Sequence, residues 1–109
     1  MPYRPQFRMR VPVPELGEGV VFWFMTSGAL EQACDVAMCE MSRGAREDGT
    51  FSLDGMTESA MAALRTVATV GVHGWEGVED EAGVPLVFSR EQLLALPWND
   101  KVAIGTAYF

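Results

Sequence analysis

The sequence predicts a small, single α+β domain. An aromatic and β-branched run follows a proline-rich start, two later stretches carry apolar residues at helical spacing, and a glycine turn precedes a capped apolar run. A chain of 109 residues has room for one hydrophobic core. We expect an extended N-terminal arm over residues 1–19 and one domain over residues 20–109. The expected elements are an N-terminal β-hairpin, two main helices, a short C-terminal hairpin and one or two C-terminal helices.

The N-terminal hairpin is predicted by two neighbouring patterns. Residues 1–19 contain four prolines, which fix φ and lack a backbone donor, so this arm suits an extended or edge position. Within it, Arg8 and Arg10 alternate with apolar side chains at the two-residue period of a strand. The run VVFWFMT that follows has the composition of a buried strand. We expect residues 6–13 to pair with residues 19–26 across a turn at LGEG.

Residues 29–41 are predicted to form an amphipathic helix, because their apolar side chains recur at three- and four-residue steps. Thr26 or Ser27 is the expected N-cap. Gly44 is the expected stop, and Arg43 lies near the negative end of the helix dipole. The predicted apolar stripe consists of Leu30, Ala33, Cys34, Ala37 and Met41.

A second helix is predicted after the loop 45–55, in which Asp48 and Gly49 favour a small hairpin. Thr57 is its expected N-cap and Gly71 marks its end. Its apolar stripe is wide, which favours a central, mostly buried helix. The stripe consists of Ala60, Met61, Ala63, Leu64, Val67, Ala68 and Val70.

The C-terminal part combines a predicted hairpin with two short helices. VHGWEGV and VPLVF read as short extended runs around EDEAG, where Gly83 suits the left-handed backbone of a turn. Pro85 lacks a donor and places its run at an edge. Ser89 and Gln92 form a capping box before REQLLAL. Pro97 breaks that helix or starts a last one over residues 98–108. The side chains expected to face inward from this last helix are Trp98, Val102 and Tyr108.

The charge distribution argues against nucleic-acid binding. The chain has eight basic and fifteen acidic side chains, a net charge of −7. Arg4, Arg8 and Arg10 place three positive charges in the first ten residues, so the rest of the chain carries −10. Proteins that bind nucleic acids need basic surface to displace counterions. We expect the basic arm to contact an acidic partner or the acidic face of its own body. No apolar run is long enough to cross a membrane.

Neither the acidic loop nor the sulfur and imidazole groups predict a reaction centre. Four acidic side chains lie between residues 76 and 81, namely Glu76, Glu79, Asp80 and Glu81. They lack the spacing of an EF-hand, so we expect a solvated turn whose charges contribute little to stability. His73 with two cysteines supplies too few ligands for zinc. Phosphate loops, nucleophile elbows and paired acid–base signatures are missing from the sequence. We expect no enzymatic activity, no metal and no cofactor.

Cys34 and Cys39 are predicted to be free thiols. On one helix, a spacing of five residues places them about 140° apart around the axis, so they cannot pair. Free thiols without a signal peptide favour a reducing compartment, and we expect a cytosolic protein. Both positions are of the core type, where a small apolar role is more common than catalysis.

Candidate protein-binding residues come from the methionines, the tryptophans and the basic arm. Seven methionines are many for this length, and adaptable methionine surfaces suit flexible partners. Tryptophans anchor interfaces, although their apolar context here makes core packing the default. We predict that the chain oligomerises or binds an amphipathic helical partner through a methionine-bearing face. The predicted partner-binding residues are Met38, Met41, Met61, Trp75, Trp98, Arg4, Arg8 and Arg10.

Residues 62–109 resemble the C-terminal portion of small proteins from tailed-phage tail gene clusters. Those proteins show a helix running into a Trp-Glu/Asp-Gly-Val turn, then an acidic stretch, Gly, Pro, an apolar-Phe-Ser sequence and a Leu-rich helix. The first half of the chain matches only in being extended and apolar. The matching positions are Trp75, Glu76, Gly77, Val78, Glu79, Asp80, Gly83, Pro85, Phe88, Ser89, Leu93 and Leu94.

The resemblance implies a tail assembly chaperone, a non-enzymatic helper in the cytoplasm of the infected host. Such a protein coats the helix-rich tape-measure protein and recruits tail-tube subunits around it. The tape-measure protein exposes apolar stripes until the tube encloses it, so another surface must cover them. An acidic body would keep that assembly in solution and discourage wrong contacts.

Two other roles stay open at this point. A structural virion component, such as a neck or tail subunit, would reach a neighbouring subunit with its arginine-bearing arm and would be found in the virion. A small regulator would inhibit another protein through its acidic surface. A chaperone is absent from mature particles, whereas a subunit is stoichiometric in them, and a regulator is dispensable for tail formation.

Overall fold

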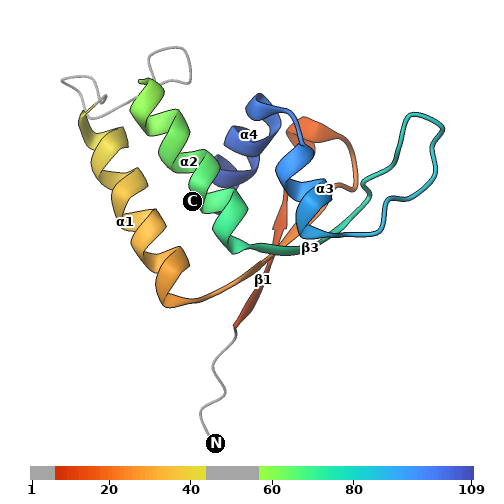
Figure 1. Cartoon of the computed structure of the whole chain (residues 1–109), viewed down its shortest axis with the longest axis horizontal. Coiled ribbons are helices and arrows are strands. Elements are labelled where there is room, and N and C mark those ends of the chain that lie inside the picture. Colours follow the sequence, from red (N-terminus) through yellow and green to blue (C-terminus); the bar gives the residue numbers. More distant parts are fainter. Residues whose placement is uncertain (1–6, 44–56) are drawn as a thin grey trace, which may run out of the picture.

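A computed structural model describes residues 7–43 and 57–109 and shows an α+β fold (Figure 1). Three strands form one antiparallel sheet in the order β1-β2-β3. The α+β class that the sequence predicts is thus confirmed. In chain order the elements are β1 (Arg8–Pro12), the 3-10 helix η1 (Pro14–Leu16), β2 (Val21–Met25), α1 (Gly28–Arg43), α2 (Glu58–Gly71), β3 (Val72–Glu76), α3 (Arg90–Ala95) and α4 (Trp98–Tyr108).

The predicted N-terminal hairpin is confirmed. β1 and β2 pair in register from Arg8 opposite Met25 to Pro12 opposite Val21. The backbone N–H of Val13 extends the pairing by donating to the Val20 carbonyl at 3.0 Å. Val13 is 1% exposed, so the chain joins the sheet and core well before residue 20. Residues 1–6, and Arg4 with them, lie outside the described part of the chain.

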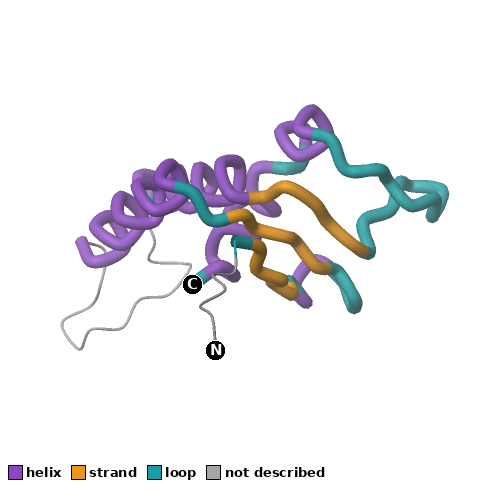
Figure 2. Tube along the Cα trace, turned by 90° about the horizontal axis from the view of Figure 1, so that it is seen from below, coloured by secondary structure: helices purple, strands orange, loops and turns teal. Residues whose placement is uncertain are grey.

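The two faces of the sheet differ because successive strand side chains point to opposite sides. Phe22 and Phe24, 1% and 0% exposed, belong to the hydrophobic core on one face. Arg10 and Trp23 are paired across β1 and β2 on the other face. Figure 2 shows the three strands side by side, and it shows the loop after β3 extending beyond α3.

Both main helices begin where the sequence places them. The Ser27 hydroxyl accepts from the Leu30 N–H at 3.1 Å at the start of α1. The Thr57 hydroxyl caps α2 by accepting from the Ala60 N–H, also at 3.1 Å. The stripe predicted for α1 faces the core, with Ala37 fully buried. The expected stop at Gly44 and the loop 45–55 lie outside the described residues.

Helix α2 is central, as its wide stripe predicts. It packs against α1 on one side and α4 on the other. The contact with α4 is so close that a Cβ at Gly105 would overlap the carbonyl oxygen of Leu64. Leu64 and Val67 are both fully buried. A glycine therefore brings the two helix backbones together at this point.

The predicted C-terminal hairpin is present in a reduced form. Its arms meet at an antiparallel bridge between Glu79 and Pro85, and the Leu86 N–H donates to the Val78 carbonyl at 2.9 Å. The second arm does not extend this bridge into a strand, because Pro85 lacks a donor and β3 pairs with β2 instead. Gly83 has φ +81°, the left-handed conformation expected of this turn.

The last two helices are confirmed, with one correction. The Ser89 hydroxyl caps α3 by accepting from the Gln92 N–H at 3.1 Å, and α4 begins directly after Pro97. Val102 is buried as expected. Trp98 is 38% exposed, so the expectation that it faces inward is wrong. It is the first residue of α4, where its ring lies at the surface, 5.7 Å from the Arg65 guanidinium carbon.

Candidate functional site

An apolar groove runs between α1 and α2, the two antiparallel helices that lie side by side in Figure 1. Small side chains on both helices leave a hollow of about 360 Å³. We call it the helical groove. Its lining residues are Ala29, Gln32, Ala33, Val36, Ala63, Thr66 and Val70.

The chemistry of the helical groove favours apolar side chains. Val36 is 52% exposed at its rim, where it adds apolar surface to the lining. The Thr66 hydroxyl donates to the Ala62 carbonyl at 3.0 Å, so its hydrogen is already used within α2. Gln32 is left as the polar side chain of the lining. A ligand would therefore bind in the groove through a close fit and apolar contacts, and it would need few polar groups to pair with the lining.

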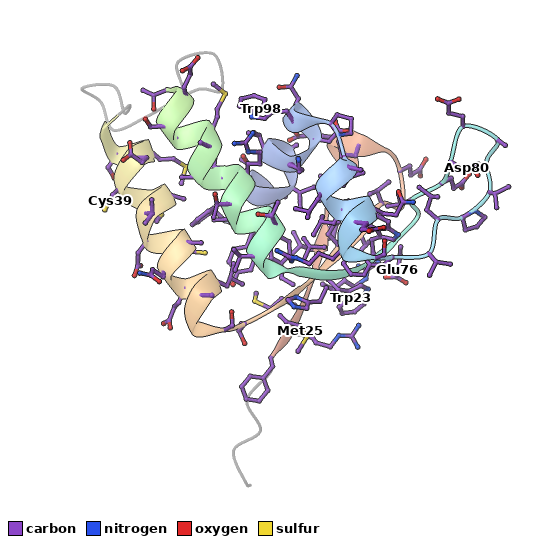
Figure 3. All side chains as sticks on the ribbon, viewed as in Figure 1. Trp23, Met25, Cys39, Glu76, Asp80 and Trp98 are labelled. Carbon is purple, nitrogen blue, oxygen red and sulfur yellow. The ribbon has the colours of Figure 1, made fainter. Side chains whose placement is uncertain are left out.

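A second surface lies on the side of the sheet away from the core. We call it the outer sheet face, and it consists of Arg8, Arg10, Trp23, Met25 and Glu76. The Trp23 indole N–H donates to the Glu76 carboxylate at 3.1 Å, and Arg10 Nε lies 3.8 Å from the same oxygen. The Arg8 guanidinium carbon lies 4.5 Å from the Trp23 ring centre. Figure 3 shows Trp23 between Met25 and Glu76.

These contacts hold the outer sheet face in place without removing it from water. More than half of the Arg10 and Glu76 side chains is exposed, 57% and 55%, so their ion pair contributes little to folding. A guanidinium over an exposed indole adds about 0.5–1 kcal/mol. Arg8 and Arg10, two of the three arginines predicted to bind a partner, are thus ordered at the surface, and Trp23 is the residue that orders Arg8.

The loop after β3, residues 77–86, is an ordered turn with an acidic tip. We call it the acidic loop. One Asp80 carboxylate oxygen accepts from the Ala82 and Val84 N–H groups, both at 2.9 Å. The expectation that all its carboxylates merely face water is therefore wrong for Asp80, which closes the turn as aspartates commonly do. Glu79 and Glu81 are exposed.

The methionines predicted to form one binding face do not come together. Met38 is 54% exposed on α1, whereas Met41 is 7% exposed and belongs to the core. Met41 continues the buried stripe of α1, so the prediction of a partner contact there is wrong. Met61 is partly buried and, with Trp98, lines a separate hollow of about 270 Å³ between α2 and α4.

Trp75 packs against the core rather than presenting its ring to a partner. Its ring meets Phe22 and Phe88 edge-on, at 6.0 and 5.0 Å between ring centres. Its indole N–H donates to the Leu86 carbonyl at 2.9 Å. The default expectation of core packing thus holds for Trp75. Its role is to attach the second arm of the acidic loop to the sheet.

The two cysteines are free, as predicted. Partial burial, followed by the Asp35 and Glu31 carboxylates, raises the pKa of the Cys34 thiol, which makes it a weaker nucleophile at neutral pH. Cys39 is exposed on the outer side of α1 (Figure 3). His73 Nδ1 lies 2.9 Å from the Gly71 carbonyl, a local contact at the start of β3.

A larger hollow, of about 480 Å³, opens beside Cys34 at the beginning of α1. Phe7 and Phe109, at the two ends of the described chain, form part of its wall and are 59% and 52% exposed. Its polar lining residues Thr26 and Ser27 are already used in local hydrogen bonds, to the Phe7 carbonyl and from the Leu30 N–H. The helical groove is the better candidate site because two long packed helices define both of its walls.

Within residues 7–43 and 57–109, no three His, Cys, Asp or Glu side chains gather as metal ligands would. In the same residues, no helix has the length and apolar character needed to span a membrane. Comparisons with protein-family models, with curated proteins and with solved structures found no match.

Proposed function

We propose that this chain is a non-enzymatic phage tail assembly chaperone that binds helical segments of a tape-measure protein and helps recruit tail-tube subunits. The observation that carries the proposal is the helical groove. Amphipathic helices bind in such grooves by inserting side chains spaced three and four residues apart. The small lining residues Ala29, Ala33 and Ala63 leave room for those side chains, while Val36 and Val70 supply apolar contact.

The charge of α1 indicates which helices would fit best. Between Gly28 and Ser42 the helix carries acidic side chains and no lysine or arginine. Glu31 and Asp35 are exposed. A partner helix with basic residues beside its apolar stripe would meet these carboxylates favourably, whereas an acidic helix would be repelled. The acidic surface would also keep a complex of two otherwise apolar stripes in solution in the host cytoplasm.

Co-expression with the tape-measure protein of the same gene cluster tests this proposal. We expect the chain to keep that protein in solution and to co-purify with fragments that contain amphipathic helices. Fragments whose apolar stripe is interrupted by aspartates serve as the matched control and should not be retained. Failure to retain any tape-measure fragment, with both proteins folded, would contradict the proposal.

A structural virion subunit is the second candidate, and the outer sheet face favours it. Arg8 and Arg10 are ordered and exposed, as a surface that contacts a neighbouring subunit requires. Mass spectrometry of purified particles separates the two candidates. The chaperone is expected to be absent from mature virions, whereas stoichiometric amounts would support the subunit.

A further inference from the structure

Two surfaces of this molecule complement each other in charge, and both carry exposed apolar side chains. The outer sheet face carries Arg8 and Arg10 in a chain whose net charge is −7. The acidic loop carries Glu79 and Glu81 on a turn that projects from the body. We propose that the outer sheet face of one copy binds the acidic loop of a second copy. This association goes beyond the proposed binding of a tape-measure helix and uses a different surface.

The outer sheet face is prepared for an acidic ligand. Arg8 is held over the Trp23 ring, 4.5 Å from its centre, and makes no ion pair with any described residue. Arg10 shares the Glu76 carboxylate with the Trp23 indole N–H, and its side chain remains 57% exposed. Both guanidinium groups can therefore donate to a further carboxylate without first breaking a contact with a buried partner. Arginine suits this role because its planar donors match a carboxylate.

Apolar contacts on both surfaces point to the same pairing. Met25 lies opposite Arg8 in the sheet and is 37% exposed. Val84, at the end of the acidic turn, is 56% exposed, and Val87 just beyond it is 86% exposed. An interface that joined the two surfaces would cover these side chains together with the charges. A patch that combines carboxylates with valines therefore matches a patch that combines guanidinium groups with methionine and tryptophan.

The acidic loop is ordered before it binds. The Asp80 carboxylate accepts two backbone N–H groups at 2.9 Å, and the Glu79–Pro85 bridge closes the base of the turn. A preformed loop loses little conformational entropy on binding, which favours association. Asp80 itself is thus occupied, and Glu79 and Glu81 are the side chains available to the arginines.

The partner of the loop must be another molecule. The acidic loop extends beyond α3 and away from the sheet, and Figure 3 shows Asp80 far from Trp23 and Met25. The loop and the outer sheet face of one copy therefore do not meet. Because the two contact surfaces differ, the association is head-to-tail and produces rings or open chains of copies. The same argument favours a second copy over an unrelated acidic protein, since the complementary segment is present in every copy.

Analytical ultracentrifugation of the full chain with charge-swapped variants tests the proposal. The wild-type chain is expected to sediment as oligomers of the 11.9 kDa unit at low salt and to dissociate at about 0.5 M NaCl, where exposed charges are screened. The double variant Arg8→Glu with Arg10→Glu should be monomeric. The double variant Glu79→Lys with Glu81→Lys should also be monomeric, and Asp80 is left intact so that the turn remains closed.

Mixing the two variants gives the decisive result. In the arginine variant both surfaces are acidic, and in the glutamate variant both are basic. Each surface of one variant therefore complements a surface of the other, so an equimolar mixture should recover the association. This recovery also shows that both variants are folded. Glu58→Lys with Glu91→Lys changes the net charge by the same amount as the loop variant, at exposed helical positions, and should associate as wild type does.

Three outcomes would overturn the proposal. The first is a wild-type chain that stays monomeric at high concentration and low salt. The second is an oligomer that persists in both double variants, which would place the interface elsewhere. The third is a mixture that remains monomeric although each variant is folded by circular dichroism, which would leave an acidic partner protein as the ligand of the outer sheet face.

Discussion

The two sides of α2 differ in how they are closed. On the side of α4, Gly105 brings the helix backbones into direct contact at Leu64, and no side chain separates them. On the side of α1, alanines and valines leave the helical groove, a hollow of about 360 Å³. The same central helix therefore meets α4 in direct backbone contact at Leu64, with a hollow of about 270 Å³ remaining beside Met61, whereas its pairing with α1 leaves a groove between the two helices.

This difference shows how small residues can serve opposite purposes. A glycine at a tight crossing removes space and fixes the angle of two helices. Alanines along a looser pairing, such as Ala29 and Ala33, create space because no larger side chain fills it. Composition alone does not distinguish the two situations, since both look like a run of small residues in a helix.

The largest expected effect comes from adding one methyl group to the closed side. Gly105→Ala should lower the free energy of unfolding by about 3 kcal/mol, because the new Cβ would overlap the Leu64 carbonyl and force the helices apart. Urea unfolding followed by circular dichroism measures this change. Gly28→Ala is the matched control, since a Cβ there meets no atom within 4 Å. Equal effects at both positions would contradict a closed contact at Gly105.

A second effect concerns two tryptophans, because Trp75 packs against the core whereas Trp98 lies at the surface. Trp75→Ala should cost about 2 kcal/mol or more, because it removes two edge-on ring contacts and leaves the Leu86 carbonyl without its donor. Trp98→Ala should cost less, since the Trp98 side chain is 38% exposed. The two variants are compared by thermal and urea unfolding. A larger loss for Trp98 would reverse this assignment of core and surface.

A third effect separates neighbouring carboxylates within the acidic loop. Asp80→Ala should cost about 1–2 kcal/mol, because two backbone N–H groups lose their acceptor. Glu79→Ala should change stability by less than about 0.5 kcal/mol, as exposed charges usually do. Chemical denaturation of each variant gives the two values. If Asp80→Ala were as mild as Glu79→Ala, the turn would not depend on that carboxylate.

The elements of this fold could be predicted because their signals are local. Ser27, Thr57 and Ser89 each cap the helix that their position in the sequence predicts. The strands of the first hairpin were predictable from their alternation and from the turn between them. Gly83 takes the left-handed conformation that its place in the turn requires. Such signals depend on a few neighbouring residues, so one sequence is enough to find them.

The candidate site could not be predicted, because it depends on pairings between distant segments. Val36 lies off the buried stripe of α1, and only the position of α2 beside it turns that face into a wall of the helical groove. Glu76 meets Arg10 and Trp23 only because β3 joins the sheet next to β2. Met41 was predictable as core from its place in the stripe, yet methionine count alone favoured a binding role that the structure contradicts.

The helical groove is tested most directly by two aspartates placed on opposite sides of α1. Val36 and Met38 are 52% and 54% exposed, so Val36→Asp and Met38→Asp introduce the same charge on the same helix at similar cost to folding. Only Val36 lines the groove. Binding of tape-measure fragments, measured by isothermal titration calorimetry, should weaken by about tenfold or more for Val36→Asp, the equivalent of about 1.4 kcal/mol, and remain close to wild type for Met38→Asp. The reverse result, with binding lost only in Met38→Asp, would contradict the groove and favour a methionine-bearing face.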